Sequence, residues 1–336
     1  MKKKAKAVLS FLGRFGLSAV LLIYLFKTMD LEKTVSVIKS ADLTFILAAL
    51  GVFLVINLVI LTRWYLFVRA LELKVPFIAV VRYFFIGLFG NLFLPSAIGG
   101  DVIKIFGLCR YTPSKAKVVA SVILDRLSGF AGMVTVAVAA FGLGYSFIND
   151  PSLFLPIGVM AVVSAVLATV LLVERIYEFG CRVFSSFPKI KEKFMNVHYD
   201  LVLIKGRKSS AFLAVGMSCL AQILLAVSFY LTARALHQDV AVIYFMVFVP
   251  MICVASSLPS IGGLGVREAG AAYFLAKVGV DSGVAVSISL MSFVFMVLVG
   301  LIGGVFYAVT RAPELLPPDT DDVLMKSSLP AGDSII

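Results

Sequence analysis

The chain carries one helix-breaking motif twice, each time inside a long apolar run. Residues 94–104 read Leu-Pro-Ser-Ala-Ile-Gly-Gly-Asp-Val-Ile-Lys, and residues 258–268 read Leu-Pro-Ser-Ile-Gly-Gly-Leu-Gly-Val-Arg-Glu. Because proline lacks a backbone donor and paired glycines favour non-helical backbone, each copy predicts a break in a helix. A bilayer tolerates such a break only where protein or a wet cavity satisfies the freed polar groups. Two matching breaks are typical of a transporter binding site.

The composition indicates a polytopic membrane protein rather than a soluble globule. Hydrophobic residues make up 61% of the chain and charged residues only 15%. The net charge of +11 comes from basic residues between the apolar runs, where the positive-inside rule accounts for them, so we expect no nucleic-acid partner. The four cysteines and two histidines show no metal-binding spacing, so neither a metal nor a cofactor is expected.

Apolar run lengths predict an all-α architecture with about six full transmembrane helices. These cover residues 9–26, 43–61, 118–145, 153–173, 211–236 and 284–310. Two further runs, residues 77–94 and 240–258, each lead through a break into a short helix, residues 101–110 and 265–277. We expect each of these units to be a re-entrant hairpin, since the short second arms cannot span a bilayer unaided. The alternative is eight full crossings.

A single integral membrane domain is expected over residues 1–312. Its basic start favours an uncleaved first helix with the N-terminus in the cytoplasm, in a multi-pass protein of the inner or plasma membrane. The least apolar internal stretch, residues 174–210, reads as a cytoplasmic connector, and residues 313–336 as a disordered tail.

Counting crossings from a cytoplasmic N-terminus opens the first hairpin to the inside and the second to the outside. Residues 43–145 and 211–310 then form two repeats of nearly equal length and inverted topology. Inverted repeats are the architecture of alternating-access carriers. The competing interpretation is that short Gly/Pro strings recur by chance in a glycine-rich membrane protein.

Ionisable side chains cluster at the breaks and in one neighbouring helix. Such groups are costly inside a membrane and are therefore functional candidates, although they can also pair with one another as a structural lock. Asp101 and Lys104 are three residues apart and so share a helix face. The full set of candidates is Asp101, Lys104, Asp125, Arg126, Arg267 and Glu268.

The breaks themselves offer a second kind of site. A serine and paired glycines before a helix start would expose backbone N–H groups and the positive end of the helix dipole, which suits a phosphate. The alternative is an ordinary capped kink. The residues concerned are Ser96, Gly99 and Gly100 in the first copy and Ser260, Gly262 and Gly263 in the second.

Other polar residues are weaker candidates. Asn91 precedes the first break by one turn, where its side chain can satisfy the freed backbone. Asn57 and Gln222 lie within apolar runs. We interpret Arg63 and Arg234 as markers of the membrane interface, since both stand at the end of a run.

Three stretches together carry a family resemblance: residues 91–104, Asp125-Arg126 and residues 257–268. They resemble the lysylphosphatidylglycerol synthase transmembrane, or flippase-like, family. That family includes the membrane half of the bacterial multiple peptide resistance factor, which moves an aminoacylated phospholipid between leaflets, and members linked to isoprenoid, hopanoid or glycolipid pathways. No aminoacyl-transferase domain follows Thr310, so the resemblance implies a stand-alone member without lysyl transfer.

The leading hypothesis is a flippase for an anionic or aminoacylated phospholipid, or an isoprenoid lipid or glycolipid. In it, Lys104, Arg126 and Arg267 hold the phosphate while the three acids balance charge. One alternative is an ion-coupled carrier of a small anion, and another is a non-transporting partner of a glycosyltransferase or synthase. The chain lacks a GxSxG elbow and a zinc motif, so no enzyme is expected. Membrane lipids are the expected partners, and homo-oligomerisation stays open.

Overall fold

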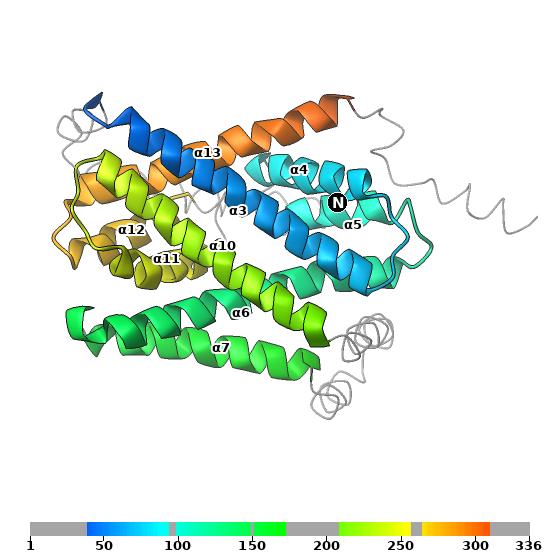
Figure 1. The fold of residues 1–336 in the computed structure, drawn as a ribbon, viewed down its shortest axis with the longest axis horizontal. Helices are drawn as coiled ribbons and strands as arrows, with labels where there is room; N and C mark the ends of the chain where they lie inside the picture. The colour runs from blue at the N-terminus through cyan, green and yellow to red at the C-terminus, as the bar shows by residue number, and fades with distance from the viewer. Residues whose placement is uncertain (1–38, 94–98, 149–150, 173–207, 257–263, 310–336) are drawn as a thin grey trace, which may run out of the picture.

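The computed structural model describes residues 39–93, 99–148, 151–172, 208–256 and 264–309, which form helices joined by short connections (Figure 1). No strand occurs among these residues, which confirms the predicted all-α class. The helices are α3 (Leu43–Ala70), α4 (Phe77–Phe93), α5 (Gly99–Leu108), α6 (Lys115–Ile148), α7 (Phe154–Leu172), α10 (Lys208–Ala235), α11 (Val242–Ser256), α12 (Val266–Ala276) and α13 (Ser282–Val309), with a 3-10 turn, η1 (Pro151–Leu153), before α7.

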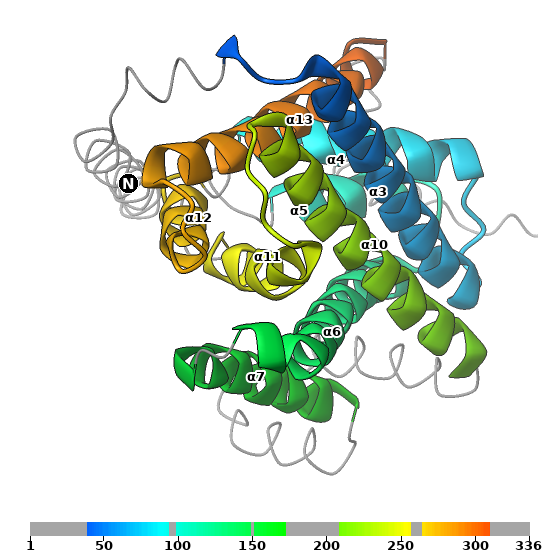
Figure 2. The same ribbon diagram turned by 60° about the vertical axis from the view of Figure 1, so that its left-hand side comes forward.

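Four described helices are long and apolar enough to cross a membrane: α3, α6, α10 and α13. They match four of the six predicted crossings. A fifth predicted crossing corresponds to α7, a 19-residue helix that packs on α6 at the outside of the bundle (Figure 2). The first predicted crossing, residues 9–26, lies outside the described residues, as does the tail. Of the predicted connector over residues 174–210, the last three residues are described and belong to α10.

An antiparallel pair, α3 and α10, crosses one face of the bundle (Figure 1). The backbone N–H of Asp42, just before α3, donates to the carbonyl of Ala235 at the end of α10 (2.9 Å). Further along, Ser228 Oγ donates to the carbonyl of Ala49 (3.1 Å). Both Ala49 and Ser228 are fully buried, because small residues let two membrane helices approach closely.

Two helical hairpins occupy opposite ends of the bundle. In the first, α5 packs on α4, and in the second, α12 packs on α11. The first hairpin follows the end of α3 and the second follows the end of the antiparallel α10, so the two enter from opposite ends (Figure 1). The long partners are exchanged in the same way, since α4 packs on α13 and α11 packs on α6.

This pairwise exchange is the arrangement that inverted repeats would give. The tips of both hairpins, residues 94–98 and 257–263, lie outside the described residues. Whether the hairpins are re-entrant, and which membrane face each one opens to, therefore stay predictions.

Close packing of α13 on α4 requires glycine. A Cβ on Gly303 would collide with the Phe85 carbonyl oxygen, and one on Gly300 would come within 2.7 Å of Leu92 Cδ1. Beside this contact the rings of Phe85 and Phe306 stack, with centroids 5.8 Å apart. A larger residue at position 303 would push α13 away from the first hairpin.

Helix α3 is longer than the sequence predicts: it ends at Ala70 rather than near residue 61. Its last turns bury Leu61, Trp64 and Phe67 at helical spacing, which stabilises the extension. Glu72 then adopts a left-handed backbone conformation (φ 58°) and the chain turns into α4. Arg63 consequently lies inside the bundle, and its interpretation as an interface marker is wrong.

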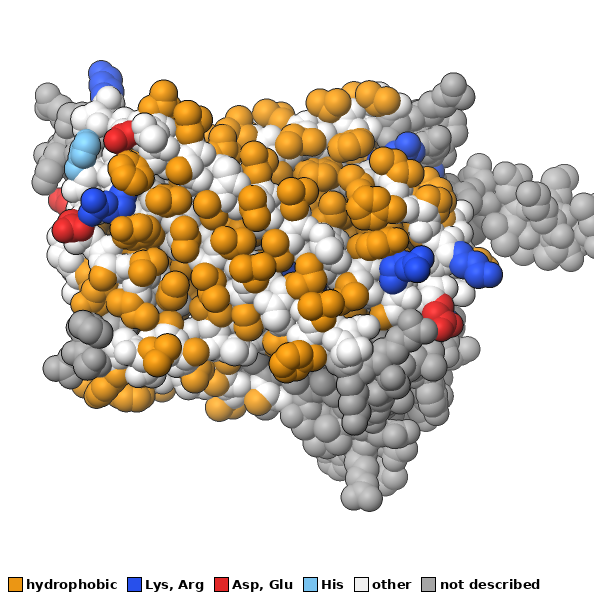
Figure 3. All heavy atoms as spheres, viewed as in Figure 1, with side chains coloured by type: hydrophobic (Ala, Val, Ile, Leu, Met, Phe, Trp, Pro, Cys, Tyr) orange, Lys and Arg blue, Asp and Glu red, His pale blue; other side chains and the backbone are white. Residues whose placement is uncertain are grey.

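The outer face of α3 and α10 is apolar over its middle. Figure 3 shows hydrophobic side chains across the centre of this face and charged side chains gathered at its two ends. A 28-residue helix such as α3 is about 42 Å long, longer than the roughly 30 Å hydrocarbon layer, so it can cross with a tilt. The exposed large side chains on the two helices are Leu43, Leu47, Leu54, Val55, Leu58, Phe212, Leu213, Leu220 and Ile223.

Candidate functional site

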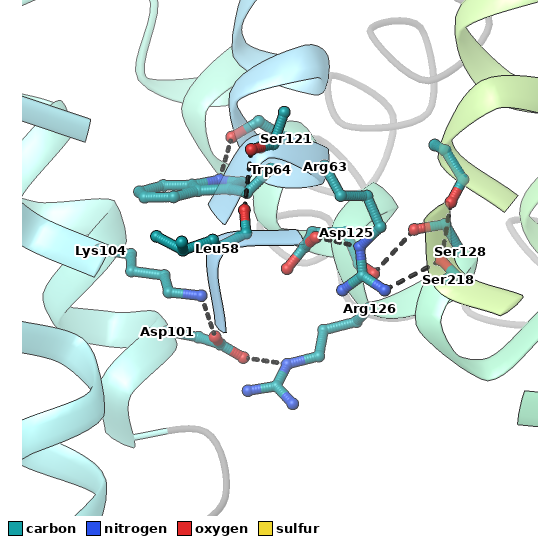
Figure 4. Close-up of polar contacts among 12 residues, drawn as sticks. Leu58, Arg63, Trp64, Asp101, Lys104, Ser121, Asp125, Arg126, Ser128 and Ser218 are labelled. Atoms are coloured by element: carbon teal, nitrogen blue, oxygen red, sulfur yellow. Dashed lines mark hydrogen bonds and ion pairs between the residues drawn. The ribbon is translucent and has the colours of Figure 1, made fainter. Parts of the chain in front are cut away.

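Five charged side chains from three helices meet inside the bundle (Figure 4). They are Arg63 from α3, Asp101 and Lys104 from α5, and Asp125 and Arg126 from α6. The group contains three cations and two anions, a formal net charge of +1. Because these helices belong to a membrane-crossing bundle, this charge is placed at a considerable energetic cost.

Asp101 stands between two cations. Its Oδ2 accepts a hydrogen bond from Arg126 Nε at 2.6 Å, and its Oδ1 lies 3.7 Å from Lys104 Nζ. The longer contact is an ion pair without a hydrogen bond, and Asp101 Oδ1 is buried with no hydrogen-bond partner among the described residues. Asp101 is therefore held firmly by Arg126 and loosely by Lys104.

Asp125 has a different partner. Its Oδ1 accepts from Arg63 Nε at 2.7 Å, and Arg63 Nη1 donates to Ser218 Oγ at 2.9 Å. Both side chains of the ion pair are more than 90% buried. This contact ties α3 to α6 and, through the serine, to α10.

Aromatic rings surround the Lys104 ammonium. Its Nζ lies 5.0 Å from the ring centroids of both Trp64 and Phe84, within cation–π range. Trp64 is itself fully buried, and its indole Nε1 donates to Ser121 Oγ at 3.4 Å. The rings and the carboxylate together stabilise a buried cation on α5.

A cavity of about 350 Å³ lies next to this cluster, with walls from both halves of the chain. The exposed fraction of the Arg126 side chain is 48%, against 8% for Lys104, so Arg126 is the most accessible charge there. The polar residues that line the cavity are Asn57, Arg63, Asn91, Lys104, Asp125, Arg126, Ser218, Gln222 and Cys253. The apolar residues of its lining include Ile56, Ile60, Phe84, Leu88, Phe130, Met133 and Leu225.

The start of α5 is stabilised by a side chain of α4. The backbone N–H of Gly100 donates to Asn91 Oδ1 at 2.8 Å, which confirms the predicted role of Asn91. A Cβ on Gly100 would collide with the Gly87 carbonyl oxygen. Both Gly99 and Gly100 are buried, and Gly100 lets α5 lie directly on α4, so it shapes the site by close packing.

The helix after the second break carries a closed charge pair. Glu268 is fully buried, with its Oε2 accepting from Gly265 N (2.6 Å) and its Oε1 accepting from Arg267 Nη2 (2.8 Å) and Ser289 Oγ (3.1 Å). Arg267 also donates to Ser289 and lies 5.6 Å from the Phe293 ring centroid. Since Glu268 caps its own helix, the start of α12 already holds a carboxylate.

The predicted residues thus fall into four groups, one of which is Gly99 and Gly100 at the start of α5. Asp101, Lys104, Asp125 and Arg126 come together in one cluster, and all but Asp101 line the cavity. The Asp101–Arg126 pair is one of the pairings that the sequence left open. Arg267 and Glu268 pair with each other and do not line the cavity. Ser96, Ser260, Gly262 and Gly263 lie outside the described residues.

Sequence reasoning missed Arg63 as a site residue and ranked Asn57 and Gln222 low, although all three line the cavity. The missed signal was the continued apolar spacing after residue 61, which carries α3 past Arg63. Arg234 does lie at the surface, where it pairs with the exposed Asp239. Among the described ranges no group of three or more His, Cys, Asp or Glu side chains could hold a metal ion.

Comparison with known proteins agrees with a membrane protein. A UPF0104 membrane protein of Pyrococcus horikoshii is 26% identical over 288 residues, which cover 78% of this chain and 85% of the relative. The family described as the lysylphosphatidylglycerol synthase TM region matches residues 11–304. That match includes both break motifs and all five charged residues of the cavity cluster. The chain is a membrane protein that belongs to the lysylphosphatidylglycerol synthase TM region family.

Proposed function

We propose that this protein moves a phosphate-bearing lipid between membrane leaflets. The headgroup enters the charged cavity, and the acyl chains stay in the bilayer. One observation carries the proposal: the half-exposed Arg126 faces a cavity inside a bundle of membrane-crossing helices. A cation is expensive at such a place and is kept there for a ligand or a pathway.

The size and chemistry of the cavity support a headgroup as the ligand. A volume of about 350 Å³ lies at the lower end of the range for small-molecule sites, so it fits a headgroup but not two acyl chains. Arginine binds phosphate with two parallel hydrogen bonds, and Lys104 adds a second positive charge. The proposal assigns no catalytic reaction to the chain.

Asp101 gives the site a means of exchanging partners. It now neutralises Arg126 at 2.6 Å, and its other oxygen lies 3.7 Å from Lys104. A phosphate arriving at Arg126 can take the place of this carboxylate, which then moves fully onto Lys104. With the phosphate bound, all three cations of the cluster have an anionic partner, which offsets the cost of holding the excess positive charge in the membrane.

Translocation of labelled lipid in proteoliposomes tests the proposal. The wild type is compared with Arg126→Gln and with the matched surface control Arg234→Gln, since Arg234 is a partly exposed arginine that also pairs with an aspartate. We expect Arg126→Gln to slow translocation at least tenfold, the effect of losing one charge-assisted hydrogen bond. Equal rates for all three proteins would reject this site.

A carrier of a small water-soluble anion is the second candidate, favoured by the modest volume of the cavity. It would use the same cations. Uptake of radiolabelled phosphate into the same proteoliposomes, without any lipid translocation, would select this candidate over the first.

A further inference from the structure

Neutral amides form a second polar part of the cavity wall. Gln222 from α10 is only 8% exposed and lines the cavity. Its Nε2 has no hydrogen-bond partner among the described residues. The Cys253 thiol interacts with this side chain, but sulfur is a weak acceptor. Because buried polar groups are normally paired, a buried amide donor in a cavity wall marks a contact point for a ligand.

Asn57 from α3 lines the same cavity. Its Nδ2 donates to the Phe53 carbonyl at 2.8 Å within its own helix, so its remaining acceptor is the oxygen Oδ1. The wall therefore offers an amide donor from Gln222 and an amide acceptor from Asn57. A hydroxyl group matches this combination, since it donates one hydrogen bond and accepts others.

Both carboxylates of the cluster are already engaged. Asp125 is paired with Arg63 at 2.7 Å, and Asp101 with Arg126 at 2.6 Å, and both acids are more than 90% buried. Among the described residues, the cavity lining contains one acid, Asp125. A cationic headgroup would meet carboxylates that are already paired with arginines, and it would face the excess positive charge of the cluster, which repels it in a low-dielectric site.

From this geometry we infer that the cavity selects a headgroup in which an anionic phosphate carries a neutral, hydroxylated substituent, and that it rejects a cationic aminoacyl headgroup. Arg126 and Lys104 bind the phosphate, and Gln222 with Asn57 binds the hydroxyl. The inference rests on the proposed function and names its substrate class: anionic phospholipids with a polyol headgroup.

The experiment compares three labelled lipids in proteoliposomes that contain the full chain. Phosphatidylglycerol carries a phosphate and hydroxyls, its lysyl ester adds cationic amines, and phosphatidylcholine has a quaternary amine without a hydroxyl. A fourth arm measures uptake of radiolabelled glycerol phosphate, which has the same recognition chemistry without acyl chains. We expect phosphatidylglycerol to move at least tenfold faster than either of the other lipids.

Two substitutions at one position test the role of the amide. Gln222→Leu removes the donor and is expected to slow phosphatidylglycerol roughly fivefold, the size of one neutral hydrogen bond. Gln222→Glu keeps the shape and adds a carboxylate, so it should narrow the preference for phosphatidylglycerol over the lysyl ester. The matched control is Gln238→Glu, since Gln238 lies in the turn after α10 and donates to the Leu236 carbonyl.

The outcomes separate the inference from the proposed function. Faster transport of the lysyl ester, or a preference that Gln222→Glu leaves unchanged, overturns the inference while lipid transport stands. Uptake of glycerol phosphate without lipid movement supports the recognition chemistry and overturns the lipid transporter. If no arm shows transport and none of the ligands raises the melting temperature of the detergent-solubilised protein, both are overturned.

Discussion

The two copies of the break motif lead into helices that use their charges differently. After the first break, Asp101 and Lys104 of α5 join residues of other helices beside a cavity. After the second, Arg267 and Glu268 of α12 bind each other and a serine of α13. One copy thus contributes to an accessible charged site, and the other builds a closed lock.

The difference lies in how completely each carboxylate is satisfied. Both oxygens of Glu268 accept hydrogen bonds, and the residue is 0% exposed. Asp101 keeps one oxygen without a hydrogen bond, next to the half-exposed Arg126. A fully satisfied pair has nothing to gain from a ligand, whereas a partly satisfied one can exchange partners. Two copies of one motif in the same chain therefore need not have equal roles.

The largest expected effect is on stability, at the closed lock. Glu268→Ala would leave Arg267, 88% buried, without its carboxylate and Gly265 N without an acceptor. Breaking a buried pair in this way costs about 3–5 kcal/mol. We expect a clear drop in the melting temperature of the detergent-solubilised protein, measured by circular dichroism as the temperature is raised.

The double variant Arg267→Met/Glu268→Met is the control for this loss. Replacing both partners by apolar groups removes the uncompensated charge, so part of the stability should return. If Glu268→Ala were as stable as the wild type, the Arg267–Glu268 pair would not stabilise the protein, and the two breaks would not differ in the way described.

The Arg63–Asp125 pair is expected to have the next largest effect. Arg63→Leu leaves Asp125 buried without its arginine, and the free energy of unfolding should fall by about 3 kcal/mol. Because both residues also line the cavity, lipid translocation should fall as well. Measuring both properties for Arg63→Leu and Glu268→Ala sharpens the contrast, since any transport loss in the second variant should follow its lost stability alone.

Arg63 also shows where sequence reasoning succeeds and fails. The helices of both hairpins were predicted to within three residues at each end, because apolar runs and Gly/Pro breaks mark them directly. Arg63-Trp64-Tyr65 looked like a membrane boundary, since a basic and aromatic triplet after an apolar run is typical of one. The structure buries Arg63 and Trp64 because α3 continues, and the partner of Arg63, Asp125, is 62 residues away.

The site was predicted best where spacing along one helix decides contact. Asp101 and Lys104 were expected to share a face, and they form an i,i+3 ion pair. Which acid would meet which arginine depends on helix packing, so the Asp101–Arg126 pair was only one of the alternatives. The separate position of Arg267 and Glu268 was missed for the same reason, since the motif does not encode the direction in which α12 packs.

Arg126→Gln is expected to separate function from stability. Because Lys104 stays beside Asp101 at 3.7 Å and 48% of the Arg126 side chain is exposed, we expect Arg126→Gln to cost less stability than Arg63→Leu. Loss of Arg126 should nevertheless slow lipid translocation by at least roughly tenfold, since a charge-assisted hydrogen bond to the phosphate disappears. A large fall in melting temperature with proportionate transport loss would mean that the first cluster is a lock like the second.

A smaller loss of stability than at Glu268 is expected from the caps that begin the two short helices. The start of α5 is stabilised by one neutral hydrogen bond, from Gly100 N to Asn91 Oδ1. The start of α12 is stabilised instead by the charged side chain of Glu268. Asn91→Leu should therefore cost about 1–2 kcal/mol, less than Glu268→Ala, because the unsatisfied group is a single amide rather than a buried cation. Asn91→Asp keeps the acceptor and should restore most of that stability in the same thermal scans.

If Asn91→Leu destabilised the protein as much as Glu268→Ala, the first hairpin would be as tightly locked as the second, and partner exchange at Asp101 would lose its structural basis.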